Sequence, residues 1–586
     1  MQQDKPRPYG ATPRSELGEA IRACRGAFLG VALISCMVNL LYLTGSIFML
    51  EIYDRVLPSR SVSTLVGLVV LAGGLYVAQG ILDLVRARIL VRIGTALDEA
   101  LSGRVFGTVV RLPLVSGGNQ GLQPLRDLDN VRSFLSGMGP SALFDLPWLP
   151  VYLAICFVFH PLIGLTALVG AVILIVLTVL TEILTRIRSA DAVALATHRS
   201  DVAAASRRNA EVLRAMGMSG RMTRRWMQAN RKYLDGHQRT SDVVGGLGAI
   251  AKVFRMALQS AVLGVGAYLV IHQQATAGLI IAGSILSARA LAPVDLAIAN
   301  WKGFVAARES WHRLNRLLQS LPAEGVPTLL DAPSRRLQVE SVSIVPPGDQ
   351  KVVVQDVTFA LEAGNGLGII GPSGSGKSSL LRALVGVWSP ARGTVRLDSA
   401  ALNQWSADKL GQHIGYLPQD VELFDGTVAE NICRDDPDAG ADAIIAAAKQ
   451  AGVHELIVGM RDGYDTQIGP QGSVLSAGQA QRIALARTLY GDPFLIVLDE
   501  PNSNLDAEGD EALTRAIRAA RTRGAIVVVV AHRPVAIEGV DLLLVMKEGR
   551  VQAFGPKDTV LGQVLQRSPA HTPPIKIVSD AGTGRP

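Results

Sequence analysis

Charged residues and cysteines are both scarce in this chain of 586 residues. Asp, Glu, Lys and Arg together make up 18% of it, and the mean hydropathy is +0.29. This composition is too apolar for an average soluble protein and predicts a membrane portion, while the length exceeds that of one domain. The four cysteines have no paired spacing, so the pattern supports neither a disulfide framework nor a metal cluster.

Charge is absent altogether from four long stretches: 26–50, 61–82, 146–181, which is broken at His160-Pro161, and 256–288, which turns at residues 272–274. A membrane helix needs roughly 20 apolar residues and the core of a secretory signal about 7–15, so the first stretch is interpreted as an uncleaved membrane helix. Six spans are predicted, at residues 27–50, 61–83, 141–159, 162–183, 250–271 and 276–298.

The basic residues predict an orientation. Five lie in residues 1–26, seven in 85–138 and twelve in 183–241, against only Arg55 and Arg60 in the loop 51–60. Loops rich in Lys and Arg stay cytoplasmic, which places the N-terminus inside. The net charge of +7 is therefore a topology signal, and no nucleic-acid partner is expected. The two long loops carry helical patterns, so the membrane helices are expected to continue into the cytosol.

The composition changes after residue 320. A linker is predicted at 321–336, and from 337 to 565 short Val/Ile-rich strands alternate with helices, which indicates an α/β domain with a largely parallel sheet. The remaining segments are an N-terminal cytoplasmic segment at 1–26, a six-span transmembrane domain with long cytoplasmic helical extensions at 27–320 and a disordered tail at 566–586.

A phosphate-binding loop is predicted at residues 371–378, which read GPSGSGKS between an apolar strand and a helix. Its glycines let backbone N–H groups converge on phosphate oxygens, the lysine neutralises charge on the β- and γ-phosphates, and the serine after it supplies a hydroxyl to Mg²⁺. The alternative is a plain Gly/Ser turn. The order of strand, loop and helix favours the phosphate-binding loop, because that loop requires this order and a plain turn does not. The nucleotide-binding set comprises Gly371, Ser373, Gly374, Gly376, Lys377, Ser378 and Ser379.

Two carboxylates follow a second apolar strand at 494–498. Asp499 is predicted to hold Mg²⁺ together with Ser378, and Glu500 to orient or deprotonate the attacking water. The alternative is that both merely end a strand. ATP and Mg²⁺ are thus the expected cofactors.

The stretch 475–479, which reads LSAGQ before a helix with two arginines, resembles the signature of ATP-binding-cassette (ABC) proteins. The resemblance covers 337–560. It implies that two such domains sandwich two ATP molecules, with each phosphate loop facing the partner's Ser476, Gly478 and Gln479. It further implies that Gln419 contacts Mg²⁺ and senses the γ-phosphate, that His532 contacts the γ-phosphate, and that Asp506 belongs to the loop completing the site.

Two positions depart from the family pattern. Ala477 replaces a glycine, which a helical φ would tolerate. The usual adenine-stacking aromatic is missing from residues 343–348, so weaker apolar contacts are expected to hold the base.

Six spans followed by one cassette resemble the half-transporter exporters, which implies a homodimer. The fold class is thus a six-helix transmembrane exporter domain followed by an α/β P-loop ATP-binding-cassette domain. The stretches 53–59, 144–150, 208–218 and 415–424 are similar to type I secretion transporters without an N-terminal peptidase-like domain. That resemblance implies export of an unfolded polypeptide with an uncleaved C-terminal signal, together with a periplasmic adaptor (membrane fusion) protein and an outer-membrane channel protein.

Three alternatives remain: an exporter of lipids or small hydrophobic molecules, a soluble cassette ATPase, and a membrane receptor that uses ATP only as a structural ligand. Charged residues in or near the spans are costly in lipid and should face protein or water. For Asp145 the choice is between a helix-start cap and the substrate path, and the path is also considered for Arg289 and Asp295. The basic loops are expected to meet membrane lipids or an acidic substrate.

Overall fold

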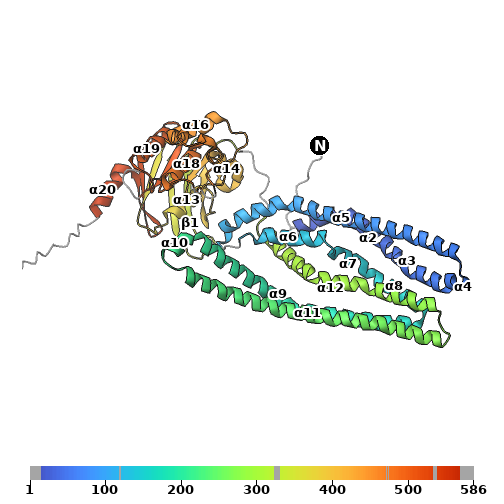
Figure 1. The fold of residues 1–586 in the computed structure, drawn as a ribbon. Coiled ribbons are helices and arrows are strands. Elements are labelled where there is room, and N and C mark those ends of the chain that lie inside the picture. The colour runs from blue at the N-terminus through green and yellow to red at the C-terminus, as the bar shows by residue number, and fades with distance from the viewer. Residues whose placement is uncertain are drawn as a thin grey trace, which may run out of the picture. The chain divides into compact units, whose positions relative to one another are not determined.

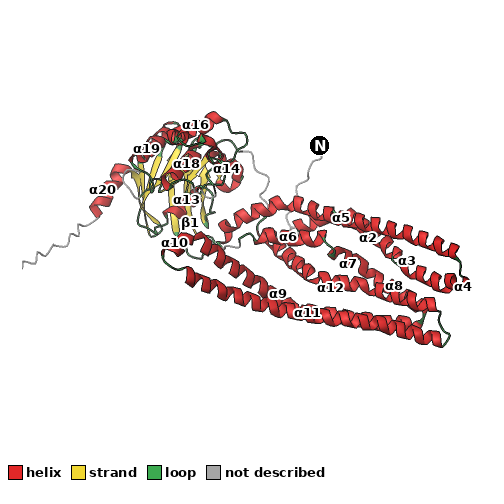
Figure 2. Ribbon diagram, in the orientation of Figure 1, coloured by secondary structure: helices red, strands yellow, loops and turns green. Residues whose placement is uncertain are grey.

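The computed structural model describes residues 15–117, 121–322, 330–469, 472, 474–531 and 537–567. The chain divides into two compact units, residues 1–109 with 121–322, and residues 110–120 with 323–586. The first is helical, and the second combines helices with strands (Figures 1 and 2). Residues 323–329 of the predicted linker and 568–586 of the predicted tail lie outside the described part of the chain.

The helical unit is built from long helices with short interruptions. Its elements are α1 (Glu16–Ala23), α2 (Arg25–Leu41), α3 (Leu43–Glu51), a π-helix (Ile52–Val56), α4 (Leu57–Ser59), α5 (Val62–Ser116), α6 (Gln123–Ser136), α7 (Gly139–Asp145), a 3₁₀ turn (Leu146–Trp148), α8 (Leu149–Phe159), α9 (Pro161–Arg208), α10 (Ala210–Ala215), α11 (Ser219–Ile271) and α12 (Ala277–Ser320).

Six helical stretches are long and apolar enough to cross a membrane: Arg25–Ser59, Val62–Ser116, Gly139–Phe159, Pro161–Thr181, Ser219–Ile271 and Ala277–Ser320. Each overlaps one predicted span. The breaks also fall where expected, because His160 is extended before Pro161 and Gln273 has a φ of 55° in the turn after α11. Helices α5, α9, α11 and α12 run well past the apolar stretches that predicted them.

Asp145 lies in a buried polar network, and its side chain does not cap the helix that follows it. It is the last residue of α7, and its side chain makes no capping bond to the 3₁₀ turn that follows. Its carboxylate accepts from Asn39 Nδ2 at 2.7 Å and forms an ion pair with Arg86 at 3.1 Å, and Arg86 also pairs with Asp83 at 2.9 Å. Asp145 and Arg86 are 6% and 5% exposed. The prediction of a helix-start cap is therefore wrong, since Asp145 instead joins α7 to α2 and α5.

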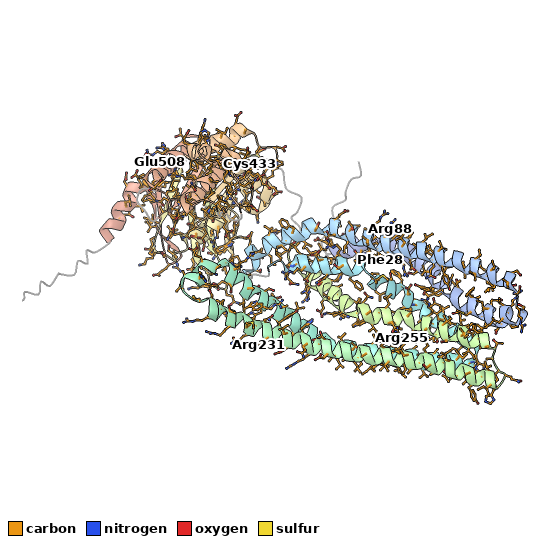
Figure 3. The ribbon with its side chains drawn as sticks, viewed as in Figure 1. Phe28, Arg88, Arg231, Arg255, Cys433 and Glu508 are labelled. Carbon is orange, nitrogen blue, oxygen red and sulfur yellow. The ribbon has the colours of Figure 1, made fainter. Side chains whose placement is uncertain are left out.

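Arg289 and Asp295, the other two charged residues considered for the substrate path, also have protein partners. The guanidinium of Arg289 on α12 stacks over the ring of Tyr42, 4.6 Å from its centroid. Asp295, also on α12, forms an ion pair with Arg255 of α11, which is labelled in Figure 3. Both contacts offset the cost of a charge among apolar helices.

The second unit holds ten strands and eight α-helices among its described residues. Its elements are β1 (Arg336–Ile344), β2 (Val354–Glu362), β3 (Gly366–Ile370), α13 (Lys377–Leu384), β4 (Arg392–Leu397), β5 (Ala400–Ala401), a 3₁₀ turn (Leu402–Gln404), α14 (Ala407–His413), β6 (Ile414–Leu417), α15 (Val428–Ile432), α16 (Ala441–Gln450), α17 (His454–Val458), a 3₁₀ turn (Gly463–Asp465), α18 (Ala477–Leu489), β7 (Leu495–Asp499), α19 (Ala507–Thr522), β8 (Ile526–Val530), β9 (Leu542–Lys547), β10 (Arg550–Pro556) and α20 (Lys557–Arg567).

A six-stranded sheet forms the centre of this unit, in the order β10-β9-β3-β8-β7-β6. All neighbours in it are parallel except β9 and β10. Alternate residues of β7 enter opposite cores: Leu495 and Val497 pack with α13, and Ile496 and Leu498 pack with α18. A parallel sheet covered on both faces explains why its strands are continuous apolar runs in the sequence.

A second sheet was not predicted. It is antiparallel, in the order β2-β1-β4-β5. Buried and more exposed residues alternate along most of β2, as expected for an antiparallel strand with one face on the core.

Candidate functional site

The predicted nucleotide motifs meet at one edge of the six-stranded sheet. Strands β3, β8, β7 and β6 are parallel neighbours, with Ile369 beside Val530, Val530 beside Asp499, and Leu498 beside Leu417. The phosphate loop, the two carboxylates and Gln419 follow the carboxyl ends of β3, β7 and β6. Such an edge is where open α/β sheets bind ligands. His532 follows β8 but lies outside the described residues.

The phosphate loop has a backbone that requires glycine. Gly374 and Gly376 have φ values of 78° and 93°, in the left-handed region, and Gly371 has a φ of 156°. A Cβ atom at Gly371 would lie 2.2 Å from the carbonyl oxygen of Met546. Gly376 is the N-cap of α13 and supplies no side-chain cap, so the first N–H groups of this helix stay available to an anion.

Lys377 begins α13 and reaches back over the loop. Its Nζ donates to the carbonyl oxygens of Gly371 at 2.8 Å and Pro372 at 2.9 Å. The side chain is buried, and burial lowers its pKa, while the carboxylates of Glu500 and Asp499 act in the opposite direction. This leaves a cation inside the loop that is predicted to bind phosphate.

Two buried polar atoms here have no partner within the described protein: Oγ of Ser375 and Oδ1 of Asp499. Asp499 is 2% exposed, and burial raises its pKa, while a hydrogen bond from Ser378 lowers it. No group of three or more His, Cys, Asp or Glu among the described residues could hold a metal unaided. The residues therefore fit a Mg²⁺ held by Ser378, Asp499, water and phosphate oxygens.

Glu500 has an unusual backbone for a residue with a side chain. Its φ is +50°, in the left-handed region, and its N–H donates to the carbonyl oxygen of Val530 at 3.0 Å. Non-glycine residues in this region are strained, and they occur where the surrounding structure holds them. The backbone of Glu500 is therefore held by β8.

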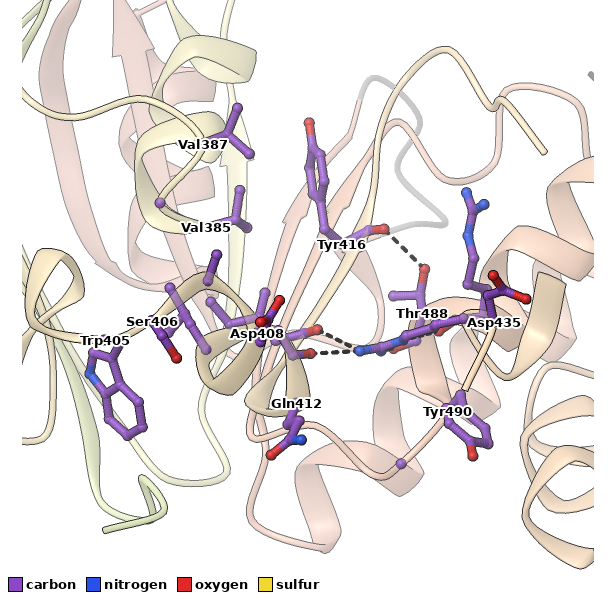
Figure 4. A pocket seen from close by; sticks show the side chains of 18 of the residues that line it. Val385, Val387, Trp405, Ser406, Asp408, Gln412, Tyr416, Asp435, Thr488 and Tyr490 are labelled. Atoms are coloured by element: carbon purple, nitrogen blue, oxygen red, sulfur yellow. Dashed lines mark hydrogen bonds between the residues drawn. The ribbon is translucent and has the colours of Figure 1, made fainter. Parts of the chain in front are cut away.

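Gln419 is exposed on the loop after β6, next to the strand that carries the carboxylates. A groove of about 1810 Å³ opens beside β6, and its lining includes Asp408, Asp435 and Trp405 (Figure 4). In its lining, Oγ1 of Thr488 donates to the carbonyl oxygen of Tyr416 at 3.3 Å. The end of α18 is thus joined to the strand that leads to Gln419.

The signature residues form the start of α18. Ser476 is its N-cap, and Ser476 and Gln479 form a reciprocal capping box with bonds of 3.3 and 2.9 Å. Ala477 is the first helical residue, so it needs no positive φ. A Cβ at Gly478 would lie 3.0 Å from the carbonyl oxygen of Asn504, which makes this glycine a point of close approach.

The structure does not bring every predicted residue to the phosphate loop. Within the described residues, no hydrogen bond joins Ser476, Gly478 or Gln479 to that loop. Asp506 caps α19, where it accepts from Gly509 N at 2.9 Å and pairs with Arg482. Its pKa is lowered by the bond from Gly509 and by Arg482.

Sequence reasoning missed Gln481, which is 2% exposed. A signal for it did exist. Gln481 precedes Ala484, Leu485 and Thr488 by three, four and seven positions, and this helical spacing puts all four on one buried face. A glutamine on such a face requires polar partners.

Comparison with known proteins agrees with both units. Residues 28–294 match the model of the ABC transporter transmembrane region, and 354–503 match that of the ABC transporter. The structure of a bacterial Atm1-family ABC exporter with ATP bound has a TM-score of 0.76 to this chain and covers 93% of it and 99% of its own length, at 21% identity. That identity shows a shared fold alone.

Two curated relatives are more similar to this chain in sequence than that exporter is. The type I secretion system ATP-binding protein PrsD of Rhizobium meliloti is 60% identical over 548 residues, which cover 93% of this chain and 94% of that protein. The leukotoxin translocation ATP-binding protein LktB of a Pasteurella haemolytica-like species is 28% identical over 92% of this chain and 77% of its own. The protein is thus a membrane protein with an ATPase domain that binds ATP, which confirms the predicted fold class. It belongs to the ABC transporter family and, within it, to the type I secretion ATP-binding proteins.

Proposed function

We propose that this chain exports an unfolded polypeptide with an uncleaved C-terminal signal across the inner membrane, as the ATP-driven component of a type I secretion system. The observation that carries the proposal is the 60% identity to PrsD across nearly the whole of both chains. The more distant relative named for leukotoxin translocation supports the same class of cargo. The N-terminus and the ATPase unit are cytoplasmic in this proposal, as the basic loops indicate.

The residues at the sheet edge have distinct tasks in ATP hydrolysis. Lys377 and the N–H groups of α13 would bind the phosphates, and Ser378 and Asp499 would hold Mg²⁺, with Gln419 beside them. The metal supplies charge neutralisation on the phosphate oxygens. Glu500 takes the proton of the attacking water. His532 is assigned to the γ-phosphate by family resemblance alone.

The active form is a homodimer in this proposal. Within the chain the signature residues lie at the start of α18, where Gly478 closely approaches the carbonyl oxygen of Asn504. A second copy would supply Ser476, Gly478 and Gln479 to each bound ATP, giving two equivalent sites. A periplasmic adaptor (membrane fusion) protein and an outer-membrane channel protein complete the proposed export path.

The test is deletion of the gene in its host, with the proteins of the culture medium compared before and after. We expect at least one protein to disappear from the medium and to return with the wild-type gene but not with Glu500→Gln. A reporter that carries the C-terminal segment of that protein should be exported, and a reporter without it should not. An unchanged set of secreted proteins with altered lipid distribution or drug resistance would refute polypeptide export and favour the lipid or small-molecule exporter.

Cargo recognition should also appear in the purified protein. A substrate alters the ATPase cycle only if it binds one conformational state more tightly than another, and a roughly tenfold preference corresponds to about 1.4 kcal/mol. We expect ATP turnover in lipid nanodiscs to respond to the unfolded reporter with the C-terminal segment and not to the one without it.

A further inference from the structure

The side chain of Gln481 links α18 to the turn that follows Glu500. Its Nε2 donates to the carbonyl oxygen of Pro501 and, at 3.5 Å, to that of Glu500. Its Oε1 accepts from the N–H of Asn504 at 3.1 Å and from the hydroxyl of Ser503 at 3.4 Å. One amide thus spans the turn from Glu500 to Asn504.

The orientation of this amide is fixed by its partners. A backbone carbonyl can only accept, and the N–H of Asn504 can only donate, so Nε2 and Oε1 cannot exchange places. Gln481 is almost fully buried, and its loss would leave the carbonyl of Pro501 and the N–H of Asn504 without this partner, while the carbonyl of Glu500 would keep its bond from the N–H of Ser503 at 3.3 Å.

Both peptide groups of Glu500 are therefore held from outside its own strand. Its N–H donates to the carbonyl of Val530 on β8, and its carbonyl, which also accepts from the N–H of Ser503 within the turn at 3.3 Å, accepts from Gln481 on α18. These two contacts flank a residue with a φ of +50°, a conformation that the surrounding structure must maintain. Two neighbouring contacts support the same turn: Gly478 against Asn504, and Arg482 with Asp506.

We propose that Gln481 is a positioning residue, which holds the backbone of Glu500 so that its carboxylate points at the attacking water. The proposal rests on the assignment of Glu500 as the water-activating group. Ser476 begins the helix that carries Gln481, and it is assigned to the partner's ATP. Helix α18 therefore joins the partner's nucleotide to the Glu500 of its own chain.

Replacement of Gln481 by glutamate removes the donor and keeps the shape. The introduced carboxylate would face the carbonyls of Glu500 and Pro501, which repel it. We expect Gln481→Glu to lower kcat at least tenfold at pH 8 while KM for ATP stays within about threefold, because the phosphate loop is untouched. Gln563→Glu, at an exposed position of α20, is the matched control and should leave both constants unchanged.

The pH profile separates positioning from general damage. Burial raises the pKa of an introduced carboxyl, and its protonated form can donate to a carbonyl again. The ratio of the kcat of Gln481→Glu to that of the wild type should therefore rise as the pH falls from 8 to 6. A ratio that stays constant, or a kcat within twofold of the wild type at pH 8, would overturn the proposal.

A readout without nucleotide completes the test. In Gln481→Leu the backbone amides of residues 500–505 should exchange with deuterium severalfold faster than in the wild type, and those of 371–378 at the same rate. Unchanged exchange at 500–505 would refute the positioning role even if the variant were inactive. A Glu500→Gln variant that still hydrolyses ATP would instead refute the assignment of Glu500, while faster exchange in Gln481→Leu would still show that Gln481 holds the turn.

Discussion

Glu500 is the side chain whose chemistry is easiest to isolate. Glu500→Gln keeps the size of the side chain and the surrounding phosphate and metal ligands, but removes the basic oxygen. We expect ATP binding to persist and hydrolysis to fall roughly 10²- to 10⁴-fold. Phosphate release and nucleotide binding by the purified protein measure the two effects. Glu508→Gln, at an exposed site on α19 (Figure 3), is the control, and near-normal turnover by Glu500→Gln would remove this residue from its role.

Asp398 gives a pH-dependent prediction in the second unit. Partial burial alone would raise its pKa, but the N–H groups of Ser334, Arg335 and Arg336, at 2.9–3.0 Å, bring it below the ordinary value. A folded-state pKa below the unfolded value of about 3.9 stabilises the protein above that pH, and the stabilisation is lost as the pH falls through the folded pKa.

Asp398→Asn should therefore lower stability at pH 7 by ~1 kcal/mol, since an uncharged acceptor replaces a charged one. The difference from the wild type should shrink as the pH falls below about 4. Thermal unfolding of the full chain in detergent at several pH values measures this, with the exposed Asp462→Asn as the control. A difference that is the same at every pH would contradict the role of the charge.

Single residues could be predicted from sequence where neighbours along the chain define them. Lys377, Ser378 and Asp499 belong to local patterns that fix both chemistry and position. Asp145 could not be assigned, because its partner Arg86 lies 59 positions away on another helix. Its environment depends on how α2, α5 and α7 pack, which local spacing does not encode.

At the scale of elements, apolar stretches predicted the six spans and the parallel strands. A helix that crosses a membrane and a strand covered on both faces each leave an uninterrupted apolar run in the sequence. The π-helix at Ile52–Val56 and the two-residue strand β5 left no such signal, and β1 and β2 only a weak alternation. The nucleotide motifs meet at one edge of the sheet because of the order of its strands. That order could not be predicted from the sequence.

The packing of α2, α5 and α7 depends on the buried pair of Arg86 and Asp145. Removing one partner of a buried ion pair costs about 3–5 kcal/mol, while replacing both by apolar residues is often neutral. We therefore expect Arg86→Met or Asp145→Leu alone to lower the thermal midpoint and the yield of monodisperse protein, and the double variant to recover part of both. Asn39 keeps its bond to the carbonyl of Ser35 in each case.

The exposed Arg88→Met on the same helix controls for loss of a positive charge (Figure 3). Single variants as stable as the wild type would show that the pair does not hold the helices. Stable single variants with selectively reduced secretion would instead return Asp145 to the substrate path.

At the scale of the whole molecule, the candidate ATP-site residues of one chain fall into two groups. The phosphate loop, Asp499 and Glu500 share one sheet edge, while the signature residues at the start of α18 pack against the turn at 504–506. Sequence motifs identified both halves. Whether these two groups complete a site within one chain or across two paired chains is an experimental question.

Mixed dimers answer that question, because each proposed site combines one chain's phosphate loop with its partner's signature. Ser476→Arg should block the partner's ATP with a bulky cation-bearing side chain, and Lys377→Ala should weaken phosphate binding in its own chain. A dimer of one Ser476→Arg chain and one Lys377→Ala chain carries both lesions in the same composite site and leaves the other site intact. Its ATPase rate, measured after purification through two different affinity tags, should exceed that of either variant homodimer. If each site were built within one chain, both sites of the mixed dimer would be damaged, and its rate would lie between those of the two homodimers.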